Sequence, residues 1–210
     1  MEGIKMNTLT VKKYNKIYSS SKMNKKIEPS QILSLIWKNF LPNSKIIDLG
    51  CGQGGDSLFL SKNNFHVTAI DSSDVAINQI RSKKDEFKLD NLVLVCGDIS
   101  DFEIVNDKYD VIICRNVLNF LDKDIALELI CNIKNNSKTG SYIIIDVFTK
   151  NDPSFLKGSK FSCYFEEQEM LKIFSNFRVV YYLENIILDN GHPGFELPHE
   201  HGVSKIIVQK

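Results

Sequence analysis

The chain has 210 residues, 43% of them hydrophobic and 25% charged, and its 26 basic and 26 acidic side chains give a formal net charge of zero. This length fits one domain with a substantial core, and the balanced charge excludes an overall basic bias toward nucleic acid. Apolar runs stay well short of the roughly 20 residues of a membrane span, and the amino terminus lacks an apolar signal core. These features favour a cytoplasmic protein that has neither a membrane nor a nucleic acid as partner.

The apolar pattern predicts helices and strands that alternate along the chain. Residues 1–27 are expected to form a lid or flexible segment, and residues 28–210 a single domain. We expect helices at 29–40, 54–62, from 74 onward, at 122–135 and at 166–174, and strands at 45–49, 65–70, 92–96, 109–114, 141–148, 177–184 and 203–208. This alternation is typical of an α/β fold with a doubly wound, mostly parallel sheet. The last two strands suggest an antiparallel carboxyl-terminal edge.

A glycine-rich turn follows the first predicted strand. Asp48 lies at the carboxyl end of the strand, and Gly50, Gly52 and Gly54 follow, so the backbone can turn tightly and approach a ligand. The spacing Gly-x-Gly-x-Gly differs from the dinucleotide pattern Gly-x-Gly-x-x-Gly. An acid directly before the glycines would repel a pyrophosphate but suit an ammonium or a sulfonium. Both features argue against a nicotinamide-dependent dehydrogenase.

The segment Asp-Leu-Gly-Cys-Gly-Gln-Gly-Gly at 48–55 resembles motif I of class I S-adenosylmethionine-dependent methyltransferases. In that family the loop lies under the amino-acid end of the cofactor. The resemblance starts at about Tyr14 and implies a Rossmann-like, seven-stranded sheet in three layers with S-adenosyl-L-methionine as cofactor. Together with Glu184, the segments 163–167 and 189–203 resemble the tellurite-resistance and thiopurine-like subgroup of small-molecule methyltransferases.

Acids after the second and third strands extend the resemblance. Asp71 ends the second strand and can accept hydrogen bonds from both ribose hydroxyls, with a further contact from Ser72. The alternative is that Asp71 caps the next helix. The resemblance implies that Asp98 contacts the adenine amino group, with Ile99 as its apolar neighbour, whereas an ordinary Gly-Asp turn is the alternative.

Two further segments complete the predicted site. Arg115 and Asn116 follow the fourth strand, and the resemblance implies that this segment flanks the methionine part of the cofactor. Arg115 either binds an anionic substrate or pairs with a surface acid. Tyr14 and Tyr18 share one helix face and either fold over the cofactor or simply pack. The residues expected to bind cofactor are Tyr14, Tyr18, Asp48, Gly50, Cys51, Gly52, Gly54, Asp71, Ser72, Asp98, Ile99, Arg115 and Asn116, and those expected in catalysis are Arg115, Glu184, His199 and His201.

Two histidines near the carboxyl terminus have three possible roles. His199 and His201 project to the same side of a strand. They act as a base or substrate contact, as metal ligands, or as structural polar residues. A metal site needs further well-spaced ligands, and only Glu184, Glu196, Glu200 and His192 are available for this role. No metal is therefore expected.

The leading hypothesis is methyl transfer from S-adenosyl-L-methionine to a small molecule at a sulfur, selenium, tellurium, oxygen or nitrogen atom. An RNA or protein methyltransferase is an alternative, but the neutral charge and the absence of an Asn-Pro-Pro-Tyr or Asp-Pro-Pro-Tyr element after the fourth strand disfavour it. A non-catalytic module that binds S-adenosylmethionine is the other alternative. The protein is expected to be a monomer or a homodimer.

Overall fold

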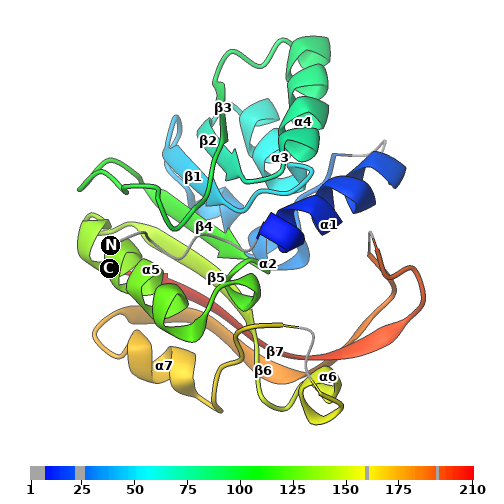
Figure 1. Ribbon diagram of the computed structural model, residues 1–210. Coiled ribbons are helices and arrows are strands. Elements are labelled where there is room, and N and C mark those ends of the chain that lie inside the picture. Colours follow the sequence, from blue (N-terminus) through cyan, green and yellow to red (C-terminus); the bar gives the residue numbers. More distant parts are fainter. Residues whose placement is uncertain (1–7, 22–26, 159–160, 193) are drawn as a thin grey trace.

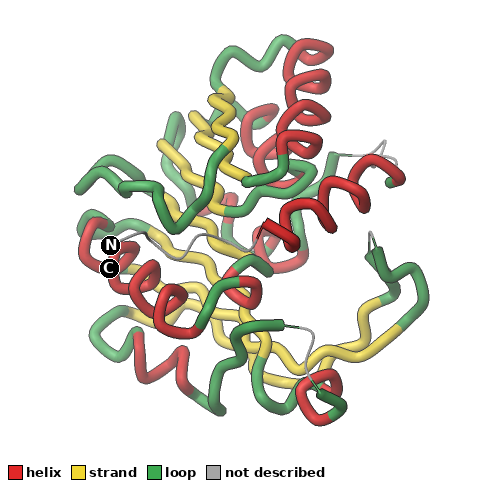
Figure 2. The backbone as a smooth tube through the Cα atoms, in the orientation of Figure 1, coloured by secondary structure: helices red, strands yellow, loops and turns green. Residues whose placement is uncertain are grey.

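A computed structural model describes residues 8–21, 27–158, 161–192 and 194–210. The described residues form one twisted seven-stranded sheet with helices on both faces (Figures 1 and 2). The strands are β1 (Lys45–Leu49), β2 (His66–Asp71), β3 (Leu92–Cys96), β4 (Val111–Arg115), β5 (Tyr142–Phe148), β6 (Arg178–Asp189) and β7 (His199–Gln209). The α-helices are α1 (Thr8–Ser20), α2 (Gln31–Ser34), α3 (Gly55–Lys62), α4 (Asp74–Phe87), α5 (Lys123–Asn136), α6 (Pro153–Leu156) and α7 (Glu169–Ile173), and the 3-10 helices are η1 (Trp37–Asn39) and η2 (Leu118–Phe120).

The strand order is β3-β2-β1-β4-β5-β7-β6. Strands β1 to β5 pair in parallel, whereas β7 is antiparallel to both β5 and β6. This confirms the doubly wound, mostly parallel fold, with β7 inserted next to the edge strand β6. The chain reverses its direction across the sheet between β1 and β4, and such sheets bind ligands at the carboxyl ends of the strands beside that point.

The central strands β1, β4 and β5 are buried on both faces, whereas the edge strands β3 and β6 are partly exposed. Ile47 of β1 packs with Leu129 of α5 in one core cluster. Its neighbour Ile46 points to the opposite face and packs with Leu58 and Ile77 of α3 and α4 in a second cluster. The alternation of neighbouring side chains in a strand thus produces the three layers.

Several predicted elements differ in extent. The helix expected at 29–40 is divided into α2 and η1, because Ile36 leaves the helical conformation at φ −132°. Residues Ile32, Leu33, Ile36 and Phe40 are nevertheless buried, as the periodicity predicts, whereas Leu35 of the same predicted face is 56% exposed. Strands β6 and β7 are longer than expected and form a hairpin whose outer end extends past the sheet (Figure 1).

The amino-terminal part contains helix α1, while 1–7 and 22–26 lie outside the described residues. Asn15 donates to Asp74 at 2.8 Å and accepts from Ser73 at 2.5 Å, which docks α1 on α4. Gly194 of the hairpin lies against Ile17, since a Cβ on it would be 2.7 Å from Ile17 Cδ1. None of the described helices is both long enough and apolar enough to cross a membrane.

Candidate functional site

A pocket of about 930 Å³ lies at the carboxyl edge of the sheet, between the glycine loop, α1 and the β6–β7 hairpin. The structure brings most of the predicted site residues to this pocket, and those that line it are Tyr14, Tyr18, Asp48, Gly50, Cys51, Gly52, Asp71, Ser72, Ile99, Arg115, Asn116 and His201. Four predicted residues are absent from its lining. Gly54 is the N-cap of α3, and Asp98 accepts the Ser100 N–H at 3.0 Å. Glu184 accepts the Gln168 N–H at 3.1 Å, and Nε2 of His199 contacts Nε2 of His201.

The glycine loop needs glycine for two separate reasons. Gly50 has a φ of +71°, a left-handed conformation that an L side chain rarely adopts. A Cβ on Gly50 would also lie 2.5 Å from Val117 Cγ2, so Val117 packs directly on the loop. At Gly52 a Cβ would be 3.1 Å from the Tyr18 hydroxyl. The loop is therefore held between the floor of the pocket and helix α1.

Asp71 holds the loop from the end of β2. One carboxylate oxygen accepts the Gly52 N–H and the other accepts the Ser73 N–H, both at 2.8 Å. The N-cap of α4 is Ser73, whose hydroxyl accepts the Ala76 N–H, so the capping alternative for Asp71 is wrong. Burial raises the pKa of Asp71, and the two backbone donors oppose this shift. Each oxygen keeps a lone pair for a ligand hydroxyl.

Asp48 lines the pocket and is 5% exposed. The Ser57 hydroxyl donates to it at 2.5 Å. Burial, and then the nearby carboxylate of Asp56, raise the pKa of Asp48 to about 7. A cationic ligand would offset both effects, because it favours the ionised carboxylate.

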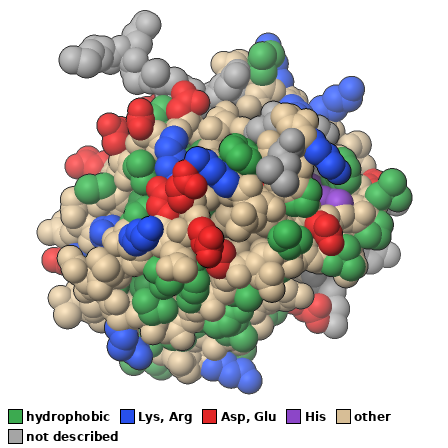
Figure 3. Space-filling model, turned by 90° about the horizontal axis from the view of Figure 1, so that it is seen from below, with side chains coloured by type: hydrophobic (Ala, Val, Ile, Leu, Met, Phe, Trp, Pro, Cys, Tyr) green, Lys and Arg blue, Asp and Glu red, His purple; other side chains and the backbone are tan. Residues whose placement is uncertain are grey.

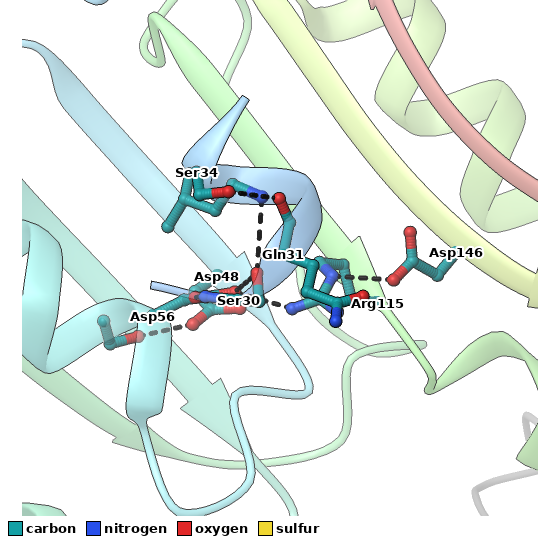
Figure 4. Close-up of polar contacts among 9 residues, drawn as sticks. Ser30, Gln31, Ser34, Asp48, Asp56, Arg115 and Asp146 are labelled. Atoms are coloured by element: carbon teal, nitrogen blue, oxygen red, sulfur yellow. Dashed lines mark hydrogen bonds and ion pairs between the residues drawn. The ribbon is translucent and has the colours of Figure 1, made fainter. Parts of the chain in front are cut away.

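Arg115 pairs with two acids, as the second of its two predicted roles requires, but both acids are buried and not at the surface (Figure 4). Its Nη1 donates to Asp56 at 2.7 Å and its Nε donates to Asp146 at 2.8 Å. Ser30 also donates to Asp56, from its backbone N–H at 2.7 Å and its hydroxyl at 2.8 Å. Burial alone would lower the pKa of Arg115, but the carboxylates of Asp146 and Asp56 raise it above its ordinary value.

Sequence reasoning missed Asp56 and Asp146 as partners of Arg115. Asp56 is in the first turn of the helix that follows the glycine loop, and Asp146 is in the carboxyl-terminal half of β5. Parallel strands bring such positions to the same edge of the sheet. The sequence shows acids at both positions, but only the fold shows that both lie beside Arg115.

A continuous row of rings connects α1 to β7. The centroids of neighbouring rings are 4.5 to 5.6 Å apart along the series Tyr18, Tyr14, Phe120, Phe161, Phe148 and His201. Burial, followed by the charge of Asp71, raises the pKa of Tyr14 to about 12. Phe148 and Phe161 were not singled out in the sequence, because isolated phenylalanines look like ordinary core residues there.

The tail histidines meet at the far end of this row. His201 is 8% exposed, its ring stacks on Phe148, and its Nδ1 lies 3.0 Å from Asp152 Oδ2. Its Nε2 lies 2.8 Å from Nε2 of His199. Asp189 is the cross-strand partner of His199 in the hairpin, and it is not among the candidate metal ligands named from the sequence.

The amino-acid sequence of the chain matches a known protein family and several curated proteins. A family model described as "Tellurite resistance protein TehB" matches residues 9–190. The Haemophilus influenzae Rd protein named "Probable S-adenosyl-L-methionine-dependent methyltransferase TehB" is 31% identical over 144 residues, which cover 68% of this chain and 49% of that protein. The chain thus spans about half the length of the curated relatives it matches.

Solved structures share the fold. The crystal structure of TehB from Haemophilus influenzae matches with a TM-score of 0.73 and 24% identity, covering 94% of this chain and 65% of that one. Magnesium protoporphyrin IX methyltransferase from Synechocystis, solved with bound S-adenosylmethionine, matches with a TM-score of 0.65 and 17% identity over 98% of this chain and 93% of that one. The fold is therefore that of the class I methyltransferases, and the chain belongs to the tellurite resistance protein TehB family.

Proposed function

We propose that the chain binds S-adenosyl-L-methionine and transfers its methyl group to a small molecule through a sulfur, selenium, tellurium, oxygen or nitrogen atom. One observation carries the proposal. A single pocket runs from the carboxylate of Asp71 and the loop at Gly52 to the ring wall at Phe148 and His201. A nucleoside fits the first end, and the second end offers space for an acceptor.

The residues at the first end suit the two polar parts of the cofactor. Asp71 faces the pocket with a carboxylate that accepts hydrogen bonds from a ribose. Asp48 offers a buried carboxylate to a positively charged group. When bound, the cofactor supplies an activated methyl group on a sulfonium, and the carbon–sulfur bonding pair stays on sulfur while a lone pair of the acceptor forms the new bond.

The second end suits a small acceptor. Phe148, Phe161 and Ile187 provide an apolar wall, and His201 and Asp189 provide polar groups. Apolar walls exclude water and align the nucleophile, and methyl transfer needs little more than this from the protein. A soft nucleophile such as a thiol or a tellurium oxyanion needs little help from a base, because a thiol readily loses its proton to water, whereas an oxygen or nitrogen acceptor would use His201.

The proposal also includes a small-molecule partner and a cytoplasmic location. On the face shown in Figure 3, basic and acidic side chains are interspersed, which supports a small-molecule acceptor over a nucleic acid. All five cysteines are free, which supports the cytoplasm. We expect a monomer or a homodimer.

The test is a screen for formation of S-adenosylhomocysteine with thiols, selenium and tellurium oxyanions, phenols and amines. The proposal expects at least one class to be methylated, with one methyl transferred per S-adenosylhomocysteine formed. His66→Ala is a suitable control, because His66 is exposed on β2 and does not line the pocket. Binding of S-adenosylhomocysteine without transfer to any class would support the non-catalytic module instead.

A further inference from the structure

We infer that Asp189, His192, His199 and His201 bind a borderline divalent transition-metal cation of the Zn²⁺ class at the acceptor end of the pocket. One oxygen of Asp189 and one nitrogen from each histidine lie within 4.8 Å of one another. Three imidazoles and one carboxylate are a donor set that Zn²⁺ takes in proteins, with metal–nitrogen distances of about 2.0–2.1 Å. The metal site goes beyond the proposed methyl transfer and does not depend on it.

The hairpin register assembles this four-residue cluster. Asp189 ends β6 and pairs with His199, the first residue of β7. His201 lies two residues further on the same side of β7. His192 belongs to the connecting turn, where it bridges to Phe195, and its ring centroid lies 5.0 Å from that of His199. The turn therefore folds back over the two strands that carry the other ligands.

The two histidines of β7 have the outer contacts that metal-bound histidines show. Nδ1 of His201 lies 3.0 Å from Asp152 Oδ2, and Nδ1 of His199 lies 2.8 Å from the carbonyl oxygen of Leu197. Both partners only accept hydrogen bonds, so each Nδ1 donates. A carboxylate or backbone carbonyl in this role fixes the ring and leaves the other nitrogen free to bind a metal.

The opposite nitrogens then face each other. Nε2 of His199 and Nε2 of His201 are 2.8 Å apart. Because both Nδ1 atoms carry their hydrogens, both Nε2 atoms direct lone pairs into the same space, and a shared proton or a cation is needed there. Tetrahedral Zn²⁺ separates two nitrogen ligands by about 3.3 Å, which requires only a small outward rotation of the rings.

The rest of the cluster can close on the cation by side-chain rotation. Asp152 is fully buried and also accepts the Gly202 N–H at 3.0 Å, so the His201 side is fixed to the sheet. His192 is exposed and Asp189 is half-buried, so their side chains have room to move inward. Sequence reasoning expected no metal, because it did not place Asp189 beside His199.

The experiment is calorimetric titration of the full chain with Zn²⁺ alone. We expect one site per chain with a dissociation constant below about 1 μM, and at least about 100-fold weaker binding for His199→Ala and His201→Ala. Asp189→Asn and His192→Ala should weaken binding at least about 10-fold, and Asp152→Asn by about 10- to 100-fold. His66→Ala, which changes the remaining histidine of the chain, should bind as the wild type does.

Co²⁺ provides a second measurement that needs no variant. The proposal expects the strong visible absorption of a four-coordinate ion, displaced by one equivalent of Zn²⁺. Zn²⁺ binding weaker than about 100 μM, or unchanged binding in both Asp189→Asn and His192→Ala, would overturn the proposal. Titration of the same variants with S-adenosylhomocysteine separates this result from the proposed function, since the cofactor end of the pocket is intact in them.

Discussion

Nη1 of Arg115 donates to Asp56 Oδ2 at 2.7 Å, across the carboxyl edge of the sheet. The same guanidinium donates through Nε to Asp146, whose side chain is 1% exposed. Two strands, β4 and β5, are thereby connected to helix α3, and Ser30 extends the network to α2 (Figure 4). Arg115 thus holds the pocket base together through two ion pairs, one from Nε and one from Nη1.

Removal of this guanidinium should destabilise the fold. Arg115→Met leaves Asp56 and Asp146 buried without a counter-charge, a change that typically costs about 3–5 kcal/mol of the free energy of unfolding. Arg115→Lys retains the charge but cannot reach both acids as a planar fork, so it should lie between Met and wild type. Urea denaturation measures this. The control is Lys83→Ala, which breaks an exposed pair with Glu86 and should cost less than about 1 kcal/mol.

The glycine loop should not tolerate a side chain at Gly50. Gly50→Ala places a Cβ at a φ of +71° and 2.5 Å from Val117 Cγ2. Gly140→Ala is the matched control, because Gly140 has a φ of +85° but no atom within 4 Å of its Cβ position. We expect a loss of about 1–2 kcal/mol for Gly140→Ala and a distinctly larger loss for Gly50→Ala. Equal losses in thermal unfolding would show that the contact with Val117 is unimportant.

Stability should depend on pH through Asp48. Its pKa is raised from 3.8 to about 7 in the folded chain, by burial first and by Asp56 second. The folded state therefore holds a proton that the unfolded state has lost, so the contribution of Asp48 to stability is full below pH 3.8 and decreases until the pH passes about 7.

Asp48→Asn removes this dependence. The variant should gain stability relative to the wild type as the pH rises from about 4 to about 7, with a constant difference above that range. Urea denaturation at a series of pH values measures it, with the exposed Asp85→Asn on α4 as a control for the loss of one negative charge. A difference that stays flat across this range would contradict the raised pKa.

Asp71 should govern cofactor affinity. Asp71→Ala removes the acceptor for two ribose hydroxyls, and hydrogen bonds to a charged group contribute about 1.5–3 kcal/mol each, so affinity for S-adenosylhomocysteine should fall at least about 10-fold. Asp71→Asn keeps an acceptor for the Gly52 N–H and isolates the effect of charge. Asp90→Ala, in the connection before β3, is the control. Unchanged affinity in both Asp71 variants would exclude the ribose role.

The fold, and the gathering of the glycine loop and Asp71 at one end of the pocket, could be predicted because their signals are local. Strands β1 and β3 have the predicted bounds, since β3 is a continuous apolar run before a glycine and β1 carries an apolar pair directly before Asp48 and the glycine turn. The division of the 29–40 helix could not be predicted. Burial of Ile32, Leu33 and Phe40 fixes which side faces the core, but the same spacing suits one long helix or two short pieces.

The acceptor end depends on contacts between distant residues. The hairpin strands extend through polar residues such as Asp189 and His199, where the apolar alternation stops, so the sequence predicted shorter strands. Glu184 was a candidate for the base, but its carboxylate accepts hydrogen bonds from the Gln168 backbone N–H and the Tyr182 hydroxyl. The partners Asp152 and His201 are 49 residues apart in the sequence, and only the tertiary fold brings them together.

Calorimetric titration of the wild-type full chain with S-adenosylhomocysteine tests the central claim most directly. The account predicts binding of one molecule per chain with a dissociation constant of about 1–100 μM, and no competition by a nicotinamide dinucleotide. Absence of binding at about 1 mM would contradict the claim that this pocket is built for a sulfonium nucleoside.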